Sequence, residues 1–255
     1  VLAIYEKAVG PDHPDSAMCL NKLADIYADL AQHEKALPLN LRALAIYEKV
    51  LGPDHPDTAT SLNNLATNYS YLSQGEKALP LHLRALKIRD KVLGPDHPST
   101  AMSLNNLAGI YSSLAQQEKA LSLNLRALEI REKVFVPDHP DIALGLNKLA
   151  YSYSELAQHA KALQLSLRAL AINEKAFGSD HSDTAYNYAE TAFIFSQTGN
   201  PSIAILFLKK SVNAYQSQRE QVSRIGAGEL QSYTGSIADT YRALASLLSE
   251  QERLP

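Results

Sequence analysis

The sequence predicts an all-α protein, an α-solenoid built from antiparallel helix pairs. Three observations carry this prediction: a motif that returns every 42 residues, apolar residues at helical spacing within each repeat, and prolines that gather between the repeats. The motif Gly-Pro-Asp-His-Pro stands at 10–14, 52–56 and 94–98, and returns in altered form at 136–140 and 178–182. Such repeats bury their apolar faces by stacking on their neighbours.

The period divides the chain into whole and partial repeats. The whole repeats are expected at 12–53, 54–95, 96–137, 138–179 and 180–225. Residues 1–11 would end a preceding repeat, because Leu-Ala-Ile-Tyr-Glu-Lys at 2–7 returns at 44–49, and the given ends are therefore expected to be those of a fragment. Residues 1–225 would form the repeat array, and residues 226–255 the first helix of a further, truncated repeat.

Each repeat carries two apolar helical faces. In the repeat 54–95, the first face is formed by Leu62, Leu65, Ala66 and Tyr69, and the second face by residues between 78 and 88. Pro56 suits the first turn of the first helix, where a missing N–H costs little. The last repeat deviates from this pattern, since its second helix is expected to be longer, at about 202–222.

The tail is expected to add one more helix, near residues 229–251, after the break at Gly226 and Gly228. This helix would place Tyr241, Leu244, Ala245 and Leu248 at first-helix positions. Because no second helix follows, one apolar face at this end is expected to be unpartnered.

Residues on these helical faces resemble the signature of a known family. Leu62, Leu65, Ala66 and Tyr69, followed by Ala78, resemble the tetratricopeptide signature. The 42-residue unit with Leu-Asn-Asn-Leu-Ala at 62–66 and 104–108 resembles the kinesin light chain type of this repeat. The resemblance implies a right-handed superhelix that binds peptides in a concave groove lined by the first helices.

The tail carries a second resemblance. Residues 231–236, 239–245 and 250–255 are similar to the segment that precedes the CHAT domain, a caspase-like protease module, in bacterial tetratricopeptide proteins. This resemblance implies that a protease domain lies beyond the chain.

Polar residues beside the core positions of the first helices are the candidate ligand contacts. Asparagine is a poor helix former, so its recurrence in mid-helix needs a reason. Its amide can pair with the main chain of an extended peptide. The alternatives are that these amides bond to a neighbouring helix or to loop carbonyls, or that duplication copied them without a role. The candidate peptide-binding residues are Asn21, Lys22, Asn63, Asn64, Asn105, Asn106, Asn147 and Lys148.

Other recurring side chains are expected to be structural. The five loop histidines are separated by whole repeats, too far apart to converge on one metal ion, so helix entry and loop packing are favoured over metal binding. For Arg42, Arg84, Arg126 and Arg168, salt bridges between repeats or a solvated convex face are favoured over a binding stripe. Cys19 is expected to be a small buried hydrophobe.

Composition excludes several classes of function. The 24 Lys and Arg against 27 Asp and Glu give a net charge of −3, which supplies no cation excess for nucleic acid or an anionic membrane. One cysteine cannot form an internal disulfide, which suits the cytoplasm. No catalytic constellation, nucleotide-binding glycine motif or metal site is evident, so neither enzymatic activity nor a cofactor is expected.

These observations predict a non-catalytic scaffold that binds a peptide or partner protein in the concave groove. The first alternative is the sensor or regulatory arm of a CHAT protease, whose catalytic domain lies outside this chain. The second is an element of self-association through the exposed C-terminal helix face.

Overall fold

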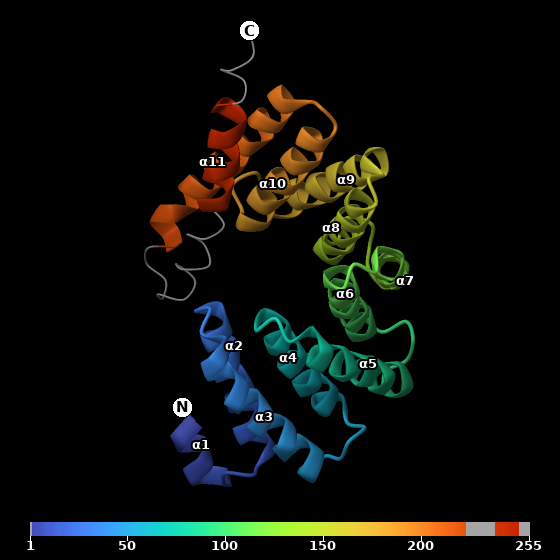
Figure 1. The fold of residues 1–255 in the computed structure, drawn as a ribbon. Coiled ribbons are helices and arrows are strands. Elements are labelled where there is room, and N and C mark those ends of the chain that lie inside the picture. Colours follow the sequence, from blue (N-terminus) through green and yellow to red (C-terminus); the bar gives the residue numbers. More distant parts are fainter. Residues whose placement is uncertain (1, 223–237, 250–255) are drawn as a thin grey trace. The chain divides into compact units, whose positions relative to one another are not determined.

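The computed structural model describes residues 2–222 and 238–249, and the described residues are helical apart from the turns that join the helices. The chain divides into two compact units, Val1–Val134 and Phe135–Pro255. The first unit holds α1 (Leu2–Val9), α2 (Pro14–Asp29), α3 (His33–Val50), α4 (Pro56–Tyr71), α5 (Gly75–Val92), α6 (Pro98–Ser113) and α7 (Gln117–Val134). The second unit holds α8 (Pro140–Glu155), α9 (His159–Phe177), α10 (Ser182–Gln197) and α11 (Pro201–Val222), followed by helical residues 238–249 (Figure 1).

Consecutive helices pair and stack in chain order within each unit, as the repeat predicts. In the first unit α2 packs on α3, α4 on α5 and α6 on α7, and α3 and α5 also pack on the first helices that follow them, α4 and α6. The first helices contact one another directly, α2 with α4 and α4 with α6, so they form one layer of this unit. The predicted all-α architecture of stacked helix pairs is confirmed.

Buried alanines let the paired helices approach closely. Ala59 and Ala85 are fully buried in a cluster with Leu62, Leu65 and Ile88, to which Leu44 of the preceding repeat also belongs. Each core layer is therefore shared between one helix pair and its neighbour, which is why a single pair would not be stable alone.

Histidine begins the first helix of each repeat. The Nδ1 atom of His55 accepts a hydrogen bond from the Asp57 N–H at 3.1 Å, and Pro56 occupies the first helical position. Thr58 Oγ1 donates to the Gly52 carbonyl at 2.8 Å and ties the loop to the helix. The equivalent histidines, His13, His97, His139 and His181, cap their helices in the same way. The prediction that these histidines mark helix entry is confirmed.

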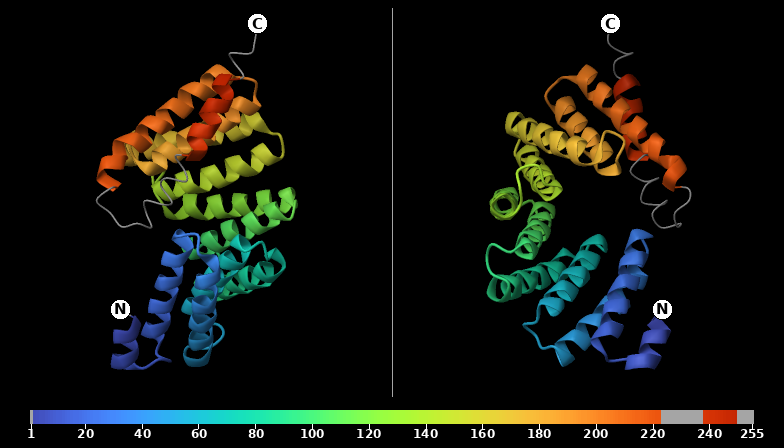
Figure 2. Two further views of the ribbon diagram at one scale, coloured as in Figure 1. Left: turned by 60° about the vertical axis from the view of Figure 1, so that its left-hand side comes forward. Right: turned by 180° about the vertical axis from the view of Figure 1, so that it is seen from behind.

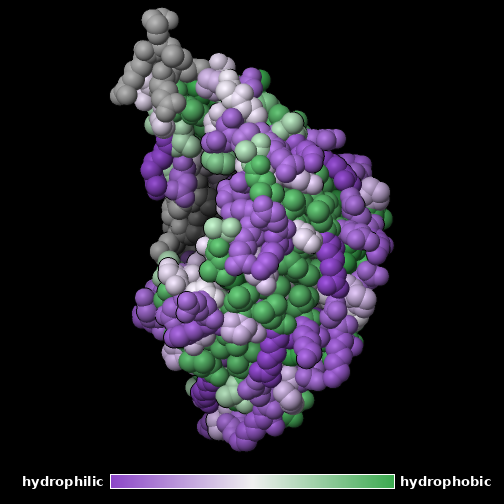
Figure 3. All heavy atoms as spheres, turned by 45° about the vertical axis from the view of Figure 1, so that its right-hand side comes forward, coloured by the Kyte–Doolittle hydropathy of each residue, from purple (hydrophilic) through white to green (hydrophobic). Residues whose placement is uncertain are grey.

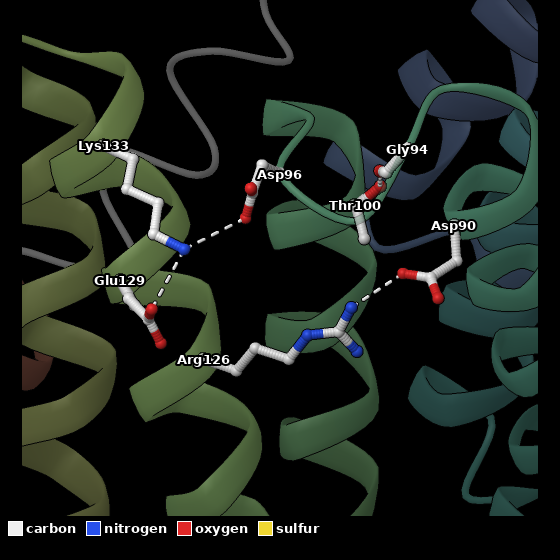
Figure 4. A network of polar contacts seen from close by, with 7 residues as sticks. All are labelled: Asp90, Gly94, Asp96, Thr100, Arg126, Glu129 and Lys133. Carbon is white, nitrogen blue, oxygen red and sulfur yellow. Dashed lines mark hydrogen bonds and ion pairs between the residues drawn. The ribbon is translucent and has the colours of Figure 1, made fainter.

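Ion pairs between successive repeats form on the second helices. Arg126 lies 2.7 Å from Asp90 of the preceding repeat (Figure 4). Lys133 pairs within its own repeat, 3.3 Å from Asp96 and 3.0 Å from Glu129. Arg42 and Arg84 pair with Glu6 and Glu48 of the preceding repeats, so the predicted salt bridges are confirmed for these arginines. All of these pairs reach solvent, where water and salt weaken the attraction between the charges.

The helix at 238–249 packs on α10 and α11 of the second unit, and Figure 2 shows this segment, in red, against the orange helices. Leu244 and Leu247 contact the cluster of Ala192, Ala204 and Leu208. Of the predicted apolar face, Leu244 packs on the core, whereas Tyr241, Ala245 and Leu248 are exposed, so the described residues cover this face only in part.

Some sequence predictions fall outside the described residues. They are the boundary at 225–226, the glycine pair Gly226 and Gly228, the motif residues 231–236 and the final residues 250–255. Cys19 is buried in α2, in agreement with its expected role as a small hydrophobe.

Candidate functional site

The first asparagine of each predicted pair lies inside the protein. Asn21, Asn63 and Asn105 have exposed fractions of 8%, 2% and 9%, so the expectation that they face a groove is wrong for these three side chains. Asn63 Nδ2 donates to Ser103 Oγ of the next first helix at 3.1 Å, and Asn105 Nδ2 donates to Asn124 Oδ1 at 2.7 Å. Bonding to a neighbouring helix, the alternative weighed above, is what the structure shows.

Asn147, the equivalent residue of the second unit, is half-buried. Its Nδ2 donates to Asn187 Oδ1 on α10 at 2.6 Å. The amide therefore links the first helices of two successive repeats, as Asn63 does through Ser103 in the first unit.

A polar network surrounds Asn63 in the first unit. His82 of α5 lies 2.9 Å from Asn63 Oδ1, and burial lowers the pKa of His82 to about 4, with a further contribution from the charge of Arg89. The Arg89 guanidinium donates to Ser103 Oγ at 2.9 Å and to Thr60 Oγ1 at 3.1 Å. These bonds satisfy polar groups that would otherwise be costly to bury, so the network is structural.

The second residue of each pair lies on the accessible side of its helix. Lys22 and Lys148 are exposed, and Asn64 and Asn106 are half-buried. Asn64 Nδ2 lies 3.5 Å from Asp25 Oδ1 of the preceding first helix, an exposed contact that leaves the Asn64 carbonyl oxygen available to a ligand. These four side chains remain candidates for ligand contact.

The residues four positions before and three positions after this second residue share its helical face. We call this face the first-helix stripe, and every member is exposed or half-buried. In the first unit the stripe consists of Met18, Lys22, Asp25, Thr60, Asn64, Thr67, Met102, Asn106 and Gly109. In the second unit it consists of Leu144, Lys148, Tyr151, Tyr186, Glu190 and Phe193.

The stripe of the second unit is rich in large apolar side chains. Leu144, Tyr151, Tyr186 and Phe193 have exposed fractions of 46%, 46%, 47% and 51%. These four residues are not among the candidate contacts predicted from the sequence. Their signal was present in the repeat register, because each occupies a position that the helical pattern places outside the core.

Apolar residues are also exposed on the second helices, including Leu83 of α5 and Leu125 of α7. On the face drawn in Figure 3, hydrophobic patches are separated by hydrophilic residues. Exposure alone therefore does not distinguish the first-helix stripe from the surface of the second helices. What distinguishes the stripe is the aromatic side chains that it carries in the second unit.

A pocket of about 460 Å³ adjoins the stripe of the second unit. Tyr186, Glu190 and Phe193 of α10 line one side, and Leu208 and Tyr215 of α11 also line the pocket. The 238–249 helix closes the other side with residues that include Asp239, Thr240 and Ser246. The tail helix therefore completes a cavity that the α10–α11 pair alone would leave open.

The Glu190 carboxyl is the main ionisable group of this pocket. Burial raises the pKa of Glu190, whereas the hydrogen bond from the Tyr186 hydroxyl and the charge of Lys148 lower it. Burial also raises the pKa of Tyr186, as does the charge of Glu190. At neutral pH the tyrosine is therefore the donor and the glutamate the acceptor.

Solved structures with similar folds include repeat proteins of the kinesin light chain type. One, from Podosopora anserina and described as having nearly identical TPR-like repeats of a kinesin light chain, is 27% identical, with a TM-score of 0.66 over 81% of this chain and 99% of that chain. BtubC (BKLC) of P. vanneervenii is 22% identical, with a TM-score of 0.68 over 80% and 82% of the two chains. The apo form of RapI is 20% identical, with a TM-score of 0.65 over 90% and 83%.

No curated protein matches the chain. Among the described residues, no helix is long and apolar enough to cross a membrane. The family model described as "Tetratricopeptide repeat" matches residues 1–49, 20–74, 70–133 and 141–217, which together cover most of the sequence. With the stacked helix pairs and the similar solved structures, this match shows that the chain belongs to the tetratricopeptide repeat family.

Proposed function

We propose that this protein is a non-catalytic scaffold that binds a segment of a partner protein along its first-helix stripes. The fold is typical of protein-interaction scaffolds. The observation that carries the proposal is the exposure of Leu144, Tyr151, Tyr186 and Phe193 at equivalent positions of two successive first helices. Rings held in water on a rigid helix are characteristic of interface anchors, because burying them against a partner is favourable.

The two units would contact a ligand through different chemistry. The stripe of the second unit offers apolar anchors, whereas Asn64, Asn106 and Thr67 of the first unit offer hydrogen-bonding groups. An amide that both donates and accepts can pair with a peptide main chain whatever its sequence. Lys22 and Lys148 add two positive charges among these contacts.

A peptide-display screen against the full chain tests this proposal. A selected 15-residue peptide should bind less tightly to at least one of the double variants Tyr151→Ala/Phe193→Ala and Asn64→Ala/Asn106→Ala. The matched control is Leu83→Ala/Leu125→Ala, which removes equally exposed apolar residues from second helices. The proposal fails if the selected peptides keep their affinity for both stripe variants, or lose it only with the control.

Two finer predictions from the sequence accompany this proposal. The tail residues 239–245 support a position before a CHAT domain, and the gene sequence beyond Pro255 tests this directly. The exposed Tyr241 and Leu248 support self-association, which sedimentation over a range of concentrations tests by comparison with Tyr241→Ser/Leu248→Ser. We also propose a cytoplasmic location, which the free thiol of Cys19 supports.

A further inference from the structure

We infer that the pocket between α10 and the 238–249 helix receives a basic side chain, lysine or arginine, of the bound segment. This inference rests on the proposed function, since Tyr186, Glu190 and Phe193 belong to both the pocket and the stripe. The inference adds to the proposed function the chemical class of one side chain of the bound segment.

The shape and lining of the pocket suit an aliphatic stem with a charged end. Leu208, Leu247 and Ala243 supply apolar walls, and the volume of about 460 Å³ lies in the range of small-ligand sites. Lysine and arginine side chains combine a long apolar stem with a cationic head. A wall of this kind favours such a stem over a short polar side chain.

Aromatic rings and a carboxylate face the same cavity. Tyr186, Phe193 and Tyr215 contribute rings, whose faces attract cations, and Glu190 contributes the negative charge. None of the described residues that line the pocket is a lysine or arginine. The cavity therefore carries a negative charge that a ligand cation would complement.

The charges around the pocket give Glu190 the central role. Asp239 lies at the pocket, but it pairs with Arg242 at 3.0 Å on an exposed surface, so its charge is largely compensated. Lys148 of α8 acts on Glu190 from outside the lining residues. Because Lys148 repels a bound cation, removing its charge should strengthen binding.

Burial of Glu190 provides the driving force. The Glu190 side chain is half-buried with the Tyr186 hydroxyl as a donor, and this burial raises the pKa of its carboxyl. A cation that enters the pocket would restore part of the electrostatic stabilisation that the carboxylate loses on burial. A neutral ligand of the same length would gain only the apolar contacts.

Small probes test this inference independently of any peptide. Binding of hexylammonium, hexylguanidinium, hexanol and hexanoate to the full chain can be followed by NMR shifts of methyl and tyrosine signals. We expect both cations to bind about tenfold more tightly than hexanol, and hexanoate to bind least. Equal affinity for hexanol and the cations, or no binding of any probe, would overturn the inference.

Three variants sharpen the test. Glu190→Gln should remove the preference for cations while hexanol binding stays the same, and Lys148→Gln should increase cation affinity severalfold. Glu118→Gln changes an exposed carboxyl of α7 that does not line the pocket, so it is the matched control and should change nothing. Unaltered cation affinity in a folded Glu190→Gln variant contradicts the inference. If peptides bind the stripe but the hexyl cations do not bind the pocket, the inference fails while the proposed function stands. The two experiments therefore distinguish failure of the inference from failure of the proposed function.

Discussion

His82 Nδ1 lies 2.9 Å from Asn63 Oδ1 in the interior of the first unit. Because Asn63 uses its Nδ2 to donate to Ser103, its carbonyl oxygen is the acceptor and the histidine Nδ1 carries the proton. The ring is therefore a neutral donor, and a second proton would place a charge beside the Arg89 guanidinium. Burial and Arg89 lower the pKa of His82 to about 4 for this reason.

The stability of the first unit should depend on pH through His82. In the unfolded chain the pKa returns to 6.5, so between pH 6.5 and about 4 the unfolded state binds a proton that the folded state does not. The free energy of unfolding should fall by about 3 kcal/mol as the pH drops through this window, and this loss should disappear as the pH rises above 6.5. Urea unfolding followed by circular dichroism at several pH values measures it.

The variant His82→Asn isolates this contribution. Asn40 and Asn124 occupy the equivalent position in neighbouring repeats, so the substitution fits the site. It should reduce the pH dependence, whereas His13→Asn, a change at an exposed helix cap, should leave the His82 contribution in place. Equal slopes for the wild type and His82→Asn would contradict the assignment.

The order of helices could be read from the sequence because its signals are local. Proline at the first turn and apolar spacing within one helix depend only on near neighbours, and the structure places α4 at Pro56 as expected. The inward position of Asn63 depends on a partner 40 residues away, Ser103. A helical wheel sets Asn63 and Asn64 about 100° apart but does not say which of them meets the next repeat.

The pocket beside Glu190 could not be predicted from the sequence either, because it is formed by tertiary contacts. The packing of Leu244 and Leu247 on the α10–α11 pair fixes which residues of the tail helix close the cavity. The repeat register alone would have indicated that the rings of Tyr186 and Phe193 are exposed. These two residues are equivalent to Met18 and Asp25 of the first repeat, which lie outside the apolar core pattern. The register could not have indicated that the 238–249 helix closes a pocket beside them.

Asn68 should be a stabilising site for substitution. Its side chain is 2% exposed, and neither Oδ1 nor Nδ2 has a hydrogen-bond partner. Ile110 and Ile194 fill the equivalent position elsewhere and are buried. Asn68→Ile should therefore raise the free energy of unfolding by about 1–3 kcal/mol, as judged by the urea midpoint.

The matched control for that change is Asn68→Ala, which removes the amide without filling the space. It should be less stable than Asn68→Ile because it leaves a cavity. A loss of stability in both variants would show that Asn68 has a partner in solution, such as an ordered water.

The turn within each helix pair carries local backbone strain. Ala31, Ala115 and Ala157 have φ values of 53°, 56° and 56°, and the fifth repeat has Gly199 at the equivalent position, with φ 73°. Glycine adopts this left-handed region without a Cβ clash. Replacing any one of these alanines by glycine should raise the free energy of unfolding by up to about 1 kcal/mol. The effects of replacements in different repeats should be additive.

An alanine inside a helix provides the opposite control. Ala45 is exposed in the middle of α3, where glycine should cost about 1 kcal/mol. Thermal unfolding of Ala31→Gly and Ala45→Gly should therefore shift in opposite directions. Shifts of the same sign would mean that the backbone at Ala31 is not strained.

Histidine at the helix start should be replaceable by a better capping residue. His97 Nδ1 accepts from the Ser99 N–H at 3.1 Å, and α6 has no acidic residue in its first turn. His97→Asp should keep the acceptor and add a negative charge at the positive end of the helix, so stability at pH 7 should be retained or raised by up to about 1 kcal/mol. His97→Ala should lose about 1 kcal/mol because the N–H loses its acceptor. Urea unfolding of the two variants measures this difference, and equal stability of the two would show that the side-chain cap contributes nothing.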